Sequence, residues 1–145
     1  MKTEIVSQPL VLEVYGFGDT APDKNYSGKA FSLMDRMWQI VRSNGIKNYG
    51  KNVWIYEPGD RIFAGVQLEE EGEVASLERK KVSLPRYARC THVGPYKRIP
   101  STGNAMRAEI KGMGLVPGLP YIEIYGHWTS DESTLETELL IAIVN

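Results

Sequence analysis

The strongest candidate for chemistry in the sequence is a glutamate set between aromatic residues. Glu123 stands in the run Tyr121-Ile-Glu-Ile-Tyr125, whose composition is typical of a strand. Alternation along a strand places Glu123 on the same face as Tyr121 and Tyr125. A carboxylate buried among aromatic walls is costly without a partner, so such a site suits a bound cation or an acid or base working near neutral pH. The alternative is a glutamate that faces solvent on a one-sided sheet.

The aromatic composition is the second signal. Eight Tyr and three Trp outnumber three Phe in the chain. A core built only for packing favours Phe, because buried Tyr O–H and Trp N–H groups need partners. We therefore expect some of the Tyr and Trp residues to contact a ligand. Trp38 is one candidate, although its place in a helical stripe suits core packing equally well.

Several other kinds of site are not predicted. His92 and His127 lack Cys or carboxylate neighbours at metal-ligand spacing, so we expect no metal and no cofactor, and a hydrogen-bonded structural role for His92. Cys90 is the single cysteine, which excludes an intramolecular disulfide; we expect it in the core. Gly16-Phe-Gly-Asp-Thr-Ala21 matches G-x-G-x-x-A, but polar residues separate it from the next helix, so it is not a dinucleotide site. The sequence has neither G-x-S-x-G nor a phosphate loop.

Charge and hydropathy narrow the class of protein. The formal net charge of -1 supplies no general attraction to nucleic acid, so no direct nucleic-acid binding is expected. The longest apolar run, Leu139–Val144, is far too short for a membrane helix, and the first residues lack the apolar core of a signal peptide. These features predict a cytoplasmic protein that makes no membrane contact.

The elements that must position these residues follow a repeated order. Residues 7–68 predict strand, helix, strand, strand, and residues 85–144 predict the same order. In the first half the expected strands are Leu10–Tyr15, Asn52–Tyr56 and Arg61–Leu68, with a helix whose apolar stripe is Phe31, Met34, Trp38 and Val41, capped by Ser27 and ended by Asn44-Gly45. In the second half they are Arg86–Val93, Tyr121–Tyr125 and Leu135–Ile143, with a helix capped by Ser101 and carrying Met106, Ile110 and Met113.

This repeat predicts the fold class. We expect one α+β domain over residues 1–145, a tandem β-α-β-β repeat with pseudo-twofold symmetry, in which an antiparallel sheet carries two main helices on one face. The intervening residues 69–84 hold the charge blocks Glu69–Glu73 and Glu78–Lys81 and read as a solvated connector. Superposing the halves places Trp54 and Glu123 at equivalent positions.

Three motifs of the second half resemble a known family. They are Tyr87-Ala-Arg-Cys-Thr-His-Val-Gly-Pro-Tyr96, Tyr121-Ile-Glu-Ile-Tyr125 and Thr137-Glu-Leu-Leu-Ile-Ala-Ile143. In this order they are similar to the GyrI-like small-molecule-binding domain, which includes the effector domains of multidrug-sensing transcription activators. Over residues 7–68 mainly the element order agrees. The final strand has Ala142 where the family commonly has proline, and the sequence contains no helix-turn-helix segment.

The resemblance implies a ligand and a site. A planar, hydrophobic and often cationic small molecule would bind in a cleft between the halves against a buried glutamate, for which Glu123 is the matching position. Glu138 matches a second acidic position, and Tyr96 matches the tyrosine of the family's "GPY" motif. With Trp38, Trp54, Tyr125 and Tyr15, these residues make up the expected ligand site.

Two alternatives also follow from the resemblance. Some stand-alone members are hydrolases that open cyclopropane-bearing DNA-alkylating compounds; Glu123 would then be the general base, and Tyr96 or Tyr125 the proton donor. The other alternative is a protein inhibitor of a larger enzyme such as a topoisomerase, for which the acidic Glu69–Glu73 run is the sequence feature.

Overall fold

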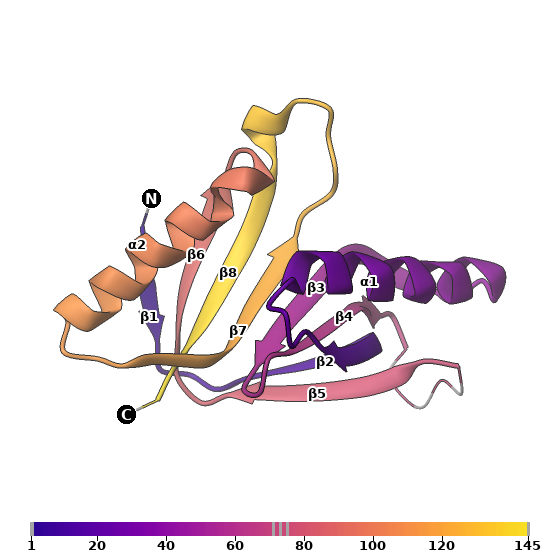
Figure 1. Ribbon diagram of the computed structural model, residues 1–145, viewed down its shortest axis with the longest axis horizontal. Coiled ribbons are helices and arrows are strands. Elements are labelled where there is room, and N and C mark those ends of the chain that lie inside the picture. The colour runs from indigo at the N-terminus through magenta and orange to yellow at the C-terminus, as the bar shows by residue number, and fades with distance from the viewer. Residues whose placement is uncertain (1, 71, 73, 75, 145) are drawn as a thin grey trace. The chain divides into compact units, whose positions relative to one another are not determined.

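The computed structural model describes residues 2–70, 72, 74 and 76–144, which form two compact units. Val11–Val82 make up the contiguous unit, and Met1–Leu10 with Ser83–Asn145 make up the discontinuous unit. The α+β class is confirmed. Along the chain the elements are β1 (Glu4–Val6), β2 (Leu10–Thr20), α1 (Tyr26–Ser43), β3 (Asn48–Glu57), β4 (Arg61–Leu68), β5 (Glu78–Leu84), β6 (Tyr87–Val93), the 3-10 turn η1 (Tyr96–Arg98), α2 (Ile99–Gly112), β7 (Pro117–Tyr125), the 3-10 turn η2 (Glu132–Thr134) and β8 (Glu136–Ile143) (Figure 1).

The strands of the contiguous unit lie in the order β3-β4-β2-β5. The β3–β4 and β2–β4 pairs are antiparallel, and β4 has the bounds that the sequence predicts. Helix α1 packs on the face that carries Trp54 and Phe17. On that face Phe31 contacts the Trp54 ring edge-on, with centroids 5.2 Å apart, and the Arg36 guanidinium lies 3.8 Å from the Phe17 ring centroid.

The buried stripe of α1 differs from the predicted one. The buried residues are Ala30, Leu33, Met37 and Val41, so only Val41 of the expected stripe is in the core. Phe31 is 54% exposed and lies at the flank of the helix, against Trp54. The buried residues follow one another at intervals of three and four, so they form one helical stripe that is turned away from Phe31 and Trp38.

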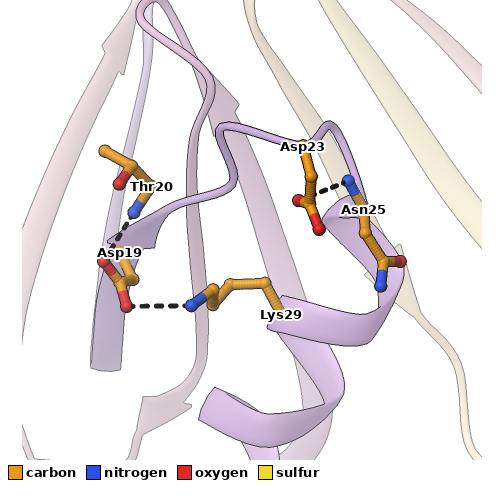
Figure 2. A network of polar contacts seen from close by, with 5 residues as sticks. All are labelled: Asp19, Thr20, Asp23, Asn25 and Lys29. Carbon is orange, nitrogen blue, oxygen red and sulfur yellow. Dashed lines mark hydrogen bonds and ion pairs between the residues drawn. The ribbon is translucent and has the colours of Figure 1, made fainter.

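The start of α1 is also corrected. Asn25, not Ser27, is the N-cap, and its side-chain oxygen accepts a hydrogen bond from the Gly28 N–H at 3.2 Å. Figure 2 shows how this end is fixed: Lys29 of α1 reaches Asp19 of β2, and the Asn25 N–H donates to Asp23. The predicted C-terminal end is confirmed, with Asn44 as the C-cap and Gly45 at a φ of 61°.

Strand β2 continues beyond Tyr15, the predicted end of the strand, through Gly16 and Gly18 to Thr20. Gly16 pairs with Gly65 of β4, and a Cβ atom built on Gly16 would collide with the Ala64 backbone. A Cβ atom on Gly65 would lie 2.5 Å from the Tyr15 carbonyl oxygen. The glycines therefore permit a close backbone approach within the sheet instead of ending the strand.

The discontinuous unit has the strand order β1-β6-β8-β7, with antiparallel β1–β6, β6–β8 and β7–β8 pairs. Its helix α2 begins at Ile99 with Pro100 in the first turn, so Ser101 lies inside the helix and is not its cap. Met106 and Ile110 are buried as predicted, whereas Met113 is exposed.

The repeat in element order is confirmed, since β2-α1-β3-β4 is followed by β6-α2-β7-β8. The two hairpins share an irregularity: the register shifts between Asn48 and Asn52 in β3, and between Pro117 and Tyr121 in β7. Both shifts lie at the same distance before Tyr56 and Tyr125. The equivalence of Trp54 and Glu123 within the two repeats follows from this match.

The predicted connector contains a strand. Residues 78–84 form β5 beside β2, and β1 pairs with β6. Each repeat is thus preceded by a short strand that belongs to the other unit. Of the acidic run, Glu71 and Glu73 lie outside the described residues. No helix in the described part of the chain is long and apolar enough to cross a bilayer.

Candidate functional site

Strand β7 places a buried carboxylate between two phenols. Glu123 is 6% exposed and accepts hydrogen bonds from the Tyr121 hydroxyl at 2.7 Å and from the Tyr125 hydroxyl at 2.5 Å. The three residues share a face because side chains two apart along a strand point the same way. Hydrogen bonds to a carboxylate are stronger than neutral ones, about 1.5–3 kcal/mol each, and offset part of its burial cost. The alternative of a solvent-facing Glu123 is wrong.

Tyr96 extends this cluster from the turn before α2. It is the first residue of η1, and its ring meets the Tyr125 ring edge-on, with centroids 5.4 Å apart and an interplanar angle of 83°. Tyr96 is 37% exposed, so part of its ring faces solvent. Burial of the remainder raises the pKa of the Tyr96 phenol above its ordinary 10.0. The phenol therefore keeps its proton at neutral pH and can act as a donor. Together with Glu123, Tyr121 and Tyr125, Tyr96 forms what we call the Glu123 cluster.

A cation already lies beside the cluster. The Arg107 guanidinium of α2 is 5.0 Å from the centre of the Tyr121 ring, within the range of a cation–π contact. Gly103, one turn earlier, is buried, and a Cβ atom there would come 3.2 Å from an Arg107 guanidinium nitrogen. The glycine leaves room for the guanidinium against the helix.

Other side chains of strands β6 and β8 share the face of the cluster. Register pairs Glu123 with Leu139 and Leu139 with Cys90, and it pairs Tyr125 with Thr137 and Thr137 with His92. Cys90 is buried, which raises the pKa of its thiol and confirms the predicted core position. His92 is hydrogen-bonded to Thr102 and to the Pro95 carbonyl, as the sequence analysis expects of a buried, hydrogen-bonded histidine.

Glu138 does not join the cluster. It pairs with Ile124 and follows Thr137 in β8, so alternation directs its side chain to the opposite face from Glu123. Its carboxylate lies 3.9 Å from an Arg89 guanidinium nitrogen, and its side chain is 39% exposed. The structure therefore separates the two acids that the resemblance groups together.

Three predicted site residues lie in the contiguous unit. Trp54 is buried against Phe31, and the Trp38 indole N–H donates to the Asn52 side chain at 2.6 Å. Tyr15 is fully buried within β2 and not at the end of its strand; its hydroxyl accepts the Gly72 N–H at 2.8 Å. Tyr15 therefore has a place in the core and a backbone partner.

The contiguous unit also has a hollow near the C-terminal end of α1, where β3 begins and β4 ends. Its volume is about 360 Å³. Its described lining does not include Trp38, Trp54 or Tyr15. The described lining residues are Gly45, Ile46, Lys47, Leu68, Glu70, Gly72 and Val74. Among residues 2–70, 72, 74 and 76–144, no group of three or more His, Cys, Asp and Glu side chains could hold a metal ion.

The sequence predicts the correct face for Tyr121, but the predicted site does not include Tyr121, Arg107 or Thr137. For Tyr121 the signal was the two-residue spacing to Glu123, which also identifies Tyr125. Arg107 could have been found only with the helix docked, since nothing in the sequence of α2 relates it to Tyr121.

Comparisons with solved structures agree with this fold over the whole chain. The EcmrR C-terminal domain is similar with a TM-score of 0.75 and 12% identity, covering 100% of this chain and 99% of that chain. SAV2435 bound to tetraphenylphosphonium is similar with a TM-score of 0.65 and 15% identity, covering 100% and 95%. A hydrolase from Listeria innocua has a TM-score of 0.61 and 12% identity, covering 99% and 92%.

Sequence comparison alone gives no such match. No protein-family description matches the chain, and no curated protein matches it. At these identities a structural likeness establishes the fold and not the activity. At the level of the fold, the comparisons support the resemblance to the GyrI-like small-molecule-binding domain.

Proposed function

We propose that this chain binds hydrophobic, aromatic, cationic small molecules at the Glu123 cluster. The observation that carries the proposal is a buried carboxylate held by two phenol hydroxyls, with a partly exposed tyrosine ring beside it. Such a carboxylate supplies a fixed negative charge, and the rings supply faces over which an organic cation is attracted. The neighbour SAV2435 was solved with tetraphenylphosphonium, a cation of this class.

The position of the hydroxyl bonds matters for such a ligand. Both phenols donate their hydroxyl hydrogens to Glu123, and a phenol oxygen that has donated its hydrogen can still attract a positively charged group. Arg107, which lies against Tyr121, would weaken the binding of a second cation close to that ring. We therefore place the ligand's charge nearer Tyr125 and Tyr96 than Tyr121.

The test compares two probes of similar shape and different charge. Glu123→Gln keeps the size of the side chain but removes the charge. Its carbonyl oxygen accepts one tyrosine hydroxyl, and its NH2 group donates to the oxygen of the other. We expect its affinity for tetraphenylphosphonium to fall at least about tenfold, or about 1.4 kcal/mol, with little change for the neutral triphenylphosphine oxide. Titration calorimetry with both probes measures the difference.

Glu136→Gln is the matched control. Glu136 is an exposed acid near the start of β8, so its neutralisation should leave both affinities unchanged. Equal losses for the two probes in Glu123→Gln would remove the counter-charge role. The prediction that Trp38, Trp54 and Tyr15 also contact the ligand stays a prediction; Trp54→Ala, measured with the same probes, tests its main member.

A second candidate is the ring-opening hydrolase. It is favoured by the adjacency of a carboxylate and a protonated phenol, Glu123 beside Tyr125, and some structural neighbours are named hydrolases. Glu123 would take a proton from the attacking water, and Tyr125 or Tyr96 would protonate the group released as the ring opens.

Turnover distinguishes the two candidates. The protein is incubated with an electrophilic cyclopropane compound, and a product heavier by one water is sought by mass spectrometry. A hydrated product that disappears in Glu123→Ala would support the enzyme. Product formation that is unchanged in Glu123→Ala would exclude this mechanism. Binding of the compound without any hydrated product would support small-molecule binding, the first candidate, over hydrolysis.

A further inference from the structure

The imidazole of His92 joins three elements of the discontinuous unit. His92 lies in β6 and is 6% exposed. Its Nδ1 is 2.7 Å from the Thr102 hydroxyl oxygen in α2, and its Nε2 is 3.0 Å from the Pro95 carbonyl oxygen. Pro95 directly precedes the η1 turn that carries Tyr96. One side chain therefore links a strand, a helix and the turn at the Glu123 cluster.

The partners fix the hydrogen positions on the ring. A carbonyl oxygen only accepts hydrogen bonds, so Nε2 must carry the hydrogen and donate to Pro95. In the neutral ring Nδ1 is then an acceptor, and the Thr102 hydroxyl donates to it. The Pro95 carbonyl also accepts the Arg98 N–H at 3.1 Å, the bond that closes the η1 turn. His92 thus holds the carbonyl around which this turn forms.

The position of the turn decides the position of Tyr96. The turn follows Gly94, whose φ of 130° favours glycine and whose N–H donates to the Leu135 carbonyl at 2.8 Å. The Tyr96 ring packs on Tyr125, and Tyr125 donates to Glu123. A path of direct contacts therefore runs from the His92 ring through Pro95, Tyr96 and Tyr125 to the buried carboxylate.

We propose that His92 is a positioning residue for the Glu123 cluster: its Nε2–H bond to the Pro95 carbonyl holds Tyr96 against Tyr125 and so sets the ligand affinity without contact with the ligand. The proposal rests on the proposed function of the cluster as a ligand site. Side chains that support a binding group from behind commonly affect affinity in this way.

Two amide substitutions separate the two bonds of the ring. The side-chain nitrogen of glutamine reaches the place of Nε2, so His92→Gln keeps a donor for Pro95 and loses the Thr102 bond. The shorter asparagine reaches the place of Nδ1, so His92→Asn keeps a Thr102 partner and loses the Pro95 bond. We expect His92→Asn to weaken tetraphenylphosphonium binding about tenfold and His92→Gln to stay within about twofold of the wild type. Equal losses in both variants would overturn the proposal.

A double-mutant cycle with Tyr96→Ala tests the path. If His92 acts through Tyr96, His92→Asn adds no further loss of affinity once Tyr96 is alanine. A general structural role would give losses that add, and it would lower the melting temperature of both His92 variants alike. Additive losses therefore contradict the positioning role.

A measurement without ligand separates this proposal from the proposed function. Hydrogen exchange at the Arg98 amide, which bonds to Pro95, should be faster in His92→Asn than in His92→Gln or the wild type. If wild-type protein does not bind the cation, the proposed function fails and exchange alone decides the role of His92 in the turn. Equal rates of Arg98 amide exchange in the wild type and both His92 variants would overturn the proposed positioning role of His92.

Discussion

At the scale of single residues, Thr137 is a buried hydroxyl in an unusual setting. It is fully buried in β8 beside Tyr125 and His92, and its Oγ1 has no hydrogen-bond partner among the described residues. A buried polar group without a partner costs about 1–3 kcal/mol. We expect Thr137→Val, which keeps the branched shape, to raise the free energy of unfolding by about 1 kcal/mol in urea titration. Thr137→Ser keeps the hydroxyl and should not raise the free energy of unfolding. A lower free energy of unfolding in Thr137→Val would indicate that the hydroxyl has a partner.

Asp19 provides a pH-dependent contribution to stability. Its carboxylate accepts the Thr20 N–H at 2.7 Å and pairs with Lys29 at 3.2 Å. The Thr20 hydrogen bond, followed by the bond and charge of Lys29, lowers the Asp19 pKa below 3.8. A lowered pKa in the folded state stabilises the protein above the unfolded pKa, and this stabilisation is lost as the pH falls through the folded pKa.

Asp19→Asn should therefore lower the free energy of unfolding at neutral pH and have no effect in strong acid. Because Asp19 is exposed, the effect should be small and should shrink in high salt. Unfolding of both proteins across the acid range measures the difference. A deficit of the same size at every pH would contradict the electrostatic cause.

At the scale of elements, the start of α1 gives a matched pair of variants. Asn25 accepts the Gly28 N–H, whereas Ser27 lies inside the first turn and is exposed. Asn25→Ala should lower stability by about 1 kcal/mol, and Ser27→Ala by no more than a few tenths. Thermal unfolding of both variants compares them. A larger loss for Ser27→Ala would restore Ser27 as the cap.

The connector gives a second contrast between elements. Deleting residues 69–72 shortens the connector and removes the Gly72 N–H that donates to the buried Tyr15 hydroxyl, so it should lower the free energy of unfolding by about 1 kcal/mol. Deleting residues 78–81 removes Arg79, the ion-pair partner of Glu13 in β2, whose side chain is only 7% exposed. An unpaired buried charge costs about 3–5 kcal/mol, so this deletion should be severe. Similar urea midpoints for the two deletions would show that β5 contributes little.

The elements that the sequence predicted are those whose pattern is local. Strand β4 is an apolar run that follows a Pro-Gly turn, and Glu123 shares a face with its tyrosines through two-residue spacing. Strand β1 has only three residues, and β5 is charged because its outward side chains face solvent, so neither shows a pattern. The face of Glu138 depends on the β7–β8 register, which the sequence does not contain.

At the scale of the whole molecule, the two sequence halves do not coincide with the two units. A fragment of residues 7–68 lacks β5, and a fragment of residues 85–144 lacks β1, so each is without one strand of its sheet. We expect both fragments to be unfolded by circular dichroism. A cooperative unfolding transition in either fragment would contradict this expectation. It would show that the fragment folds without the missing strand, β5 or β1.

Strand β1 precedes the first repeat but pairs with β6 of the discontinuous unit, and this affects the order in which the chain can assemble during synthesis. Glu4 of β1 and Arg89 of β6 are hydrogen-bonded although 85 residues separate them. At ~5–20 residues per second, a ribosome makes the partner of β1 roughly 4–17 s after β1 itself. The contiguous unit is complete by Val82, before β6 exists. β1 must wait through that interval, and its three-residue length and charged Glu4 make it a poor template for another chain in the meantime.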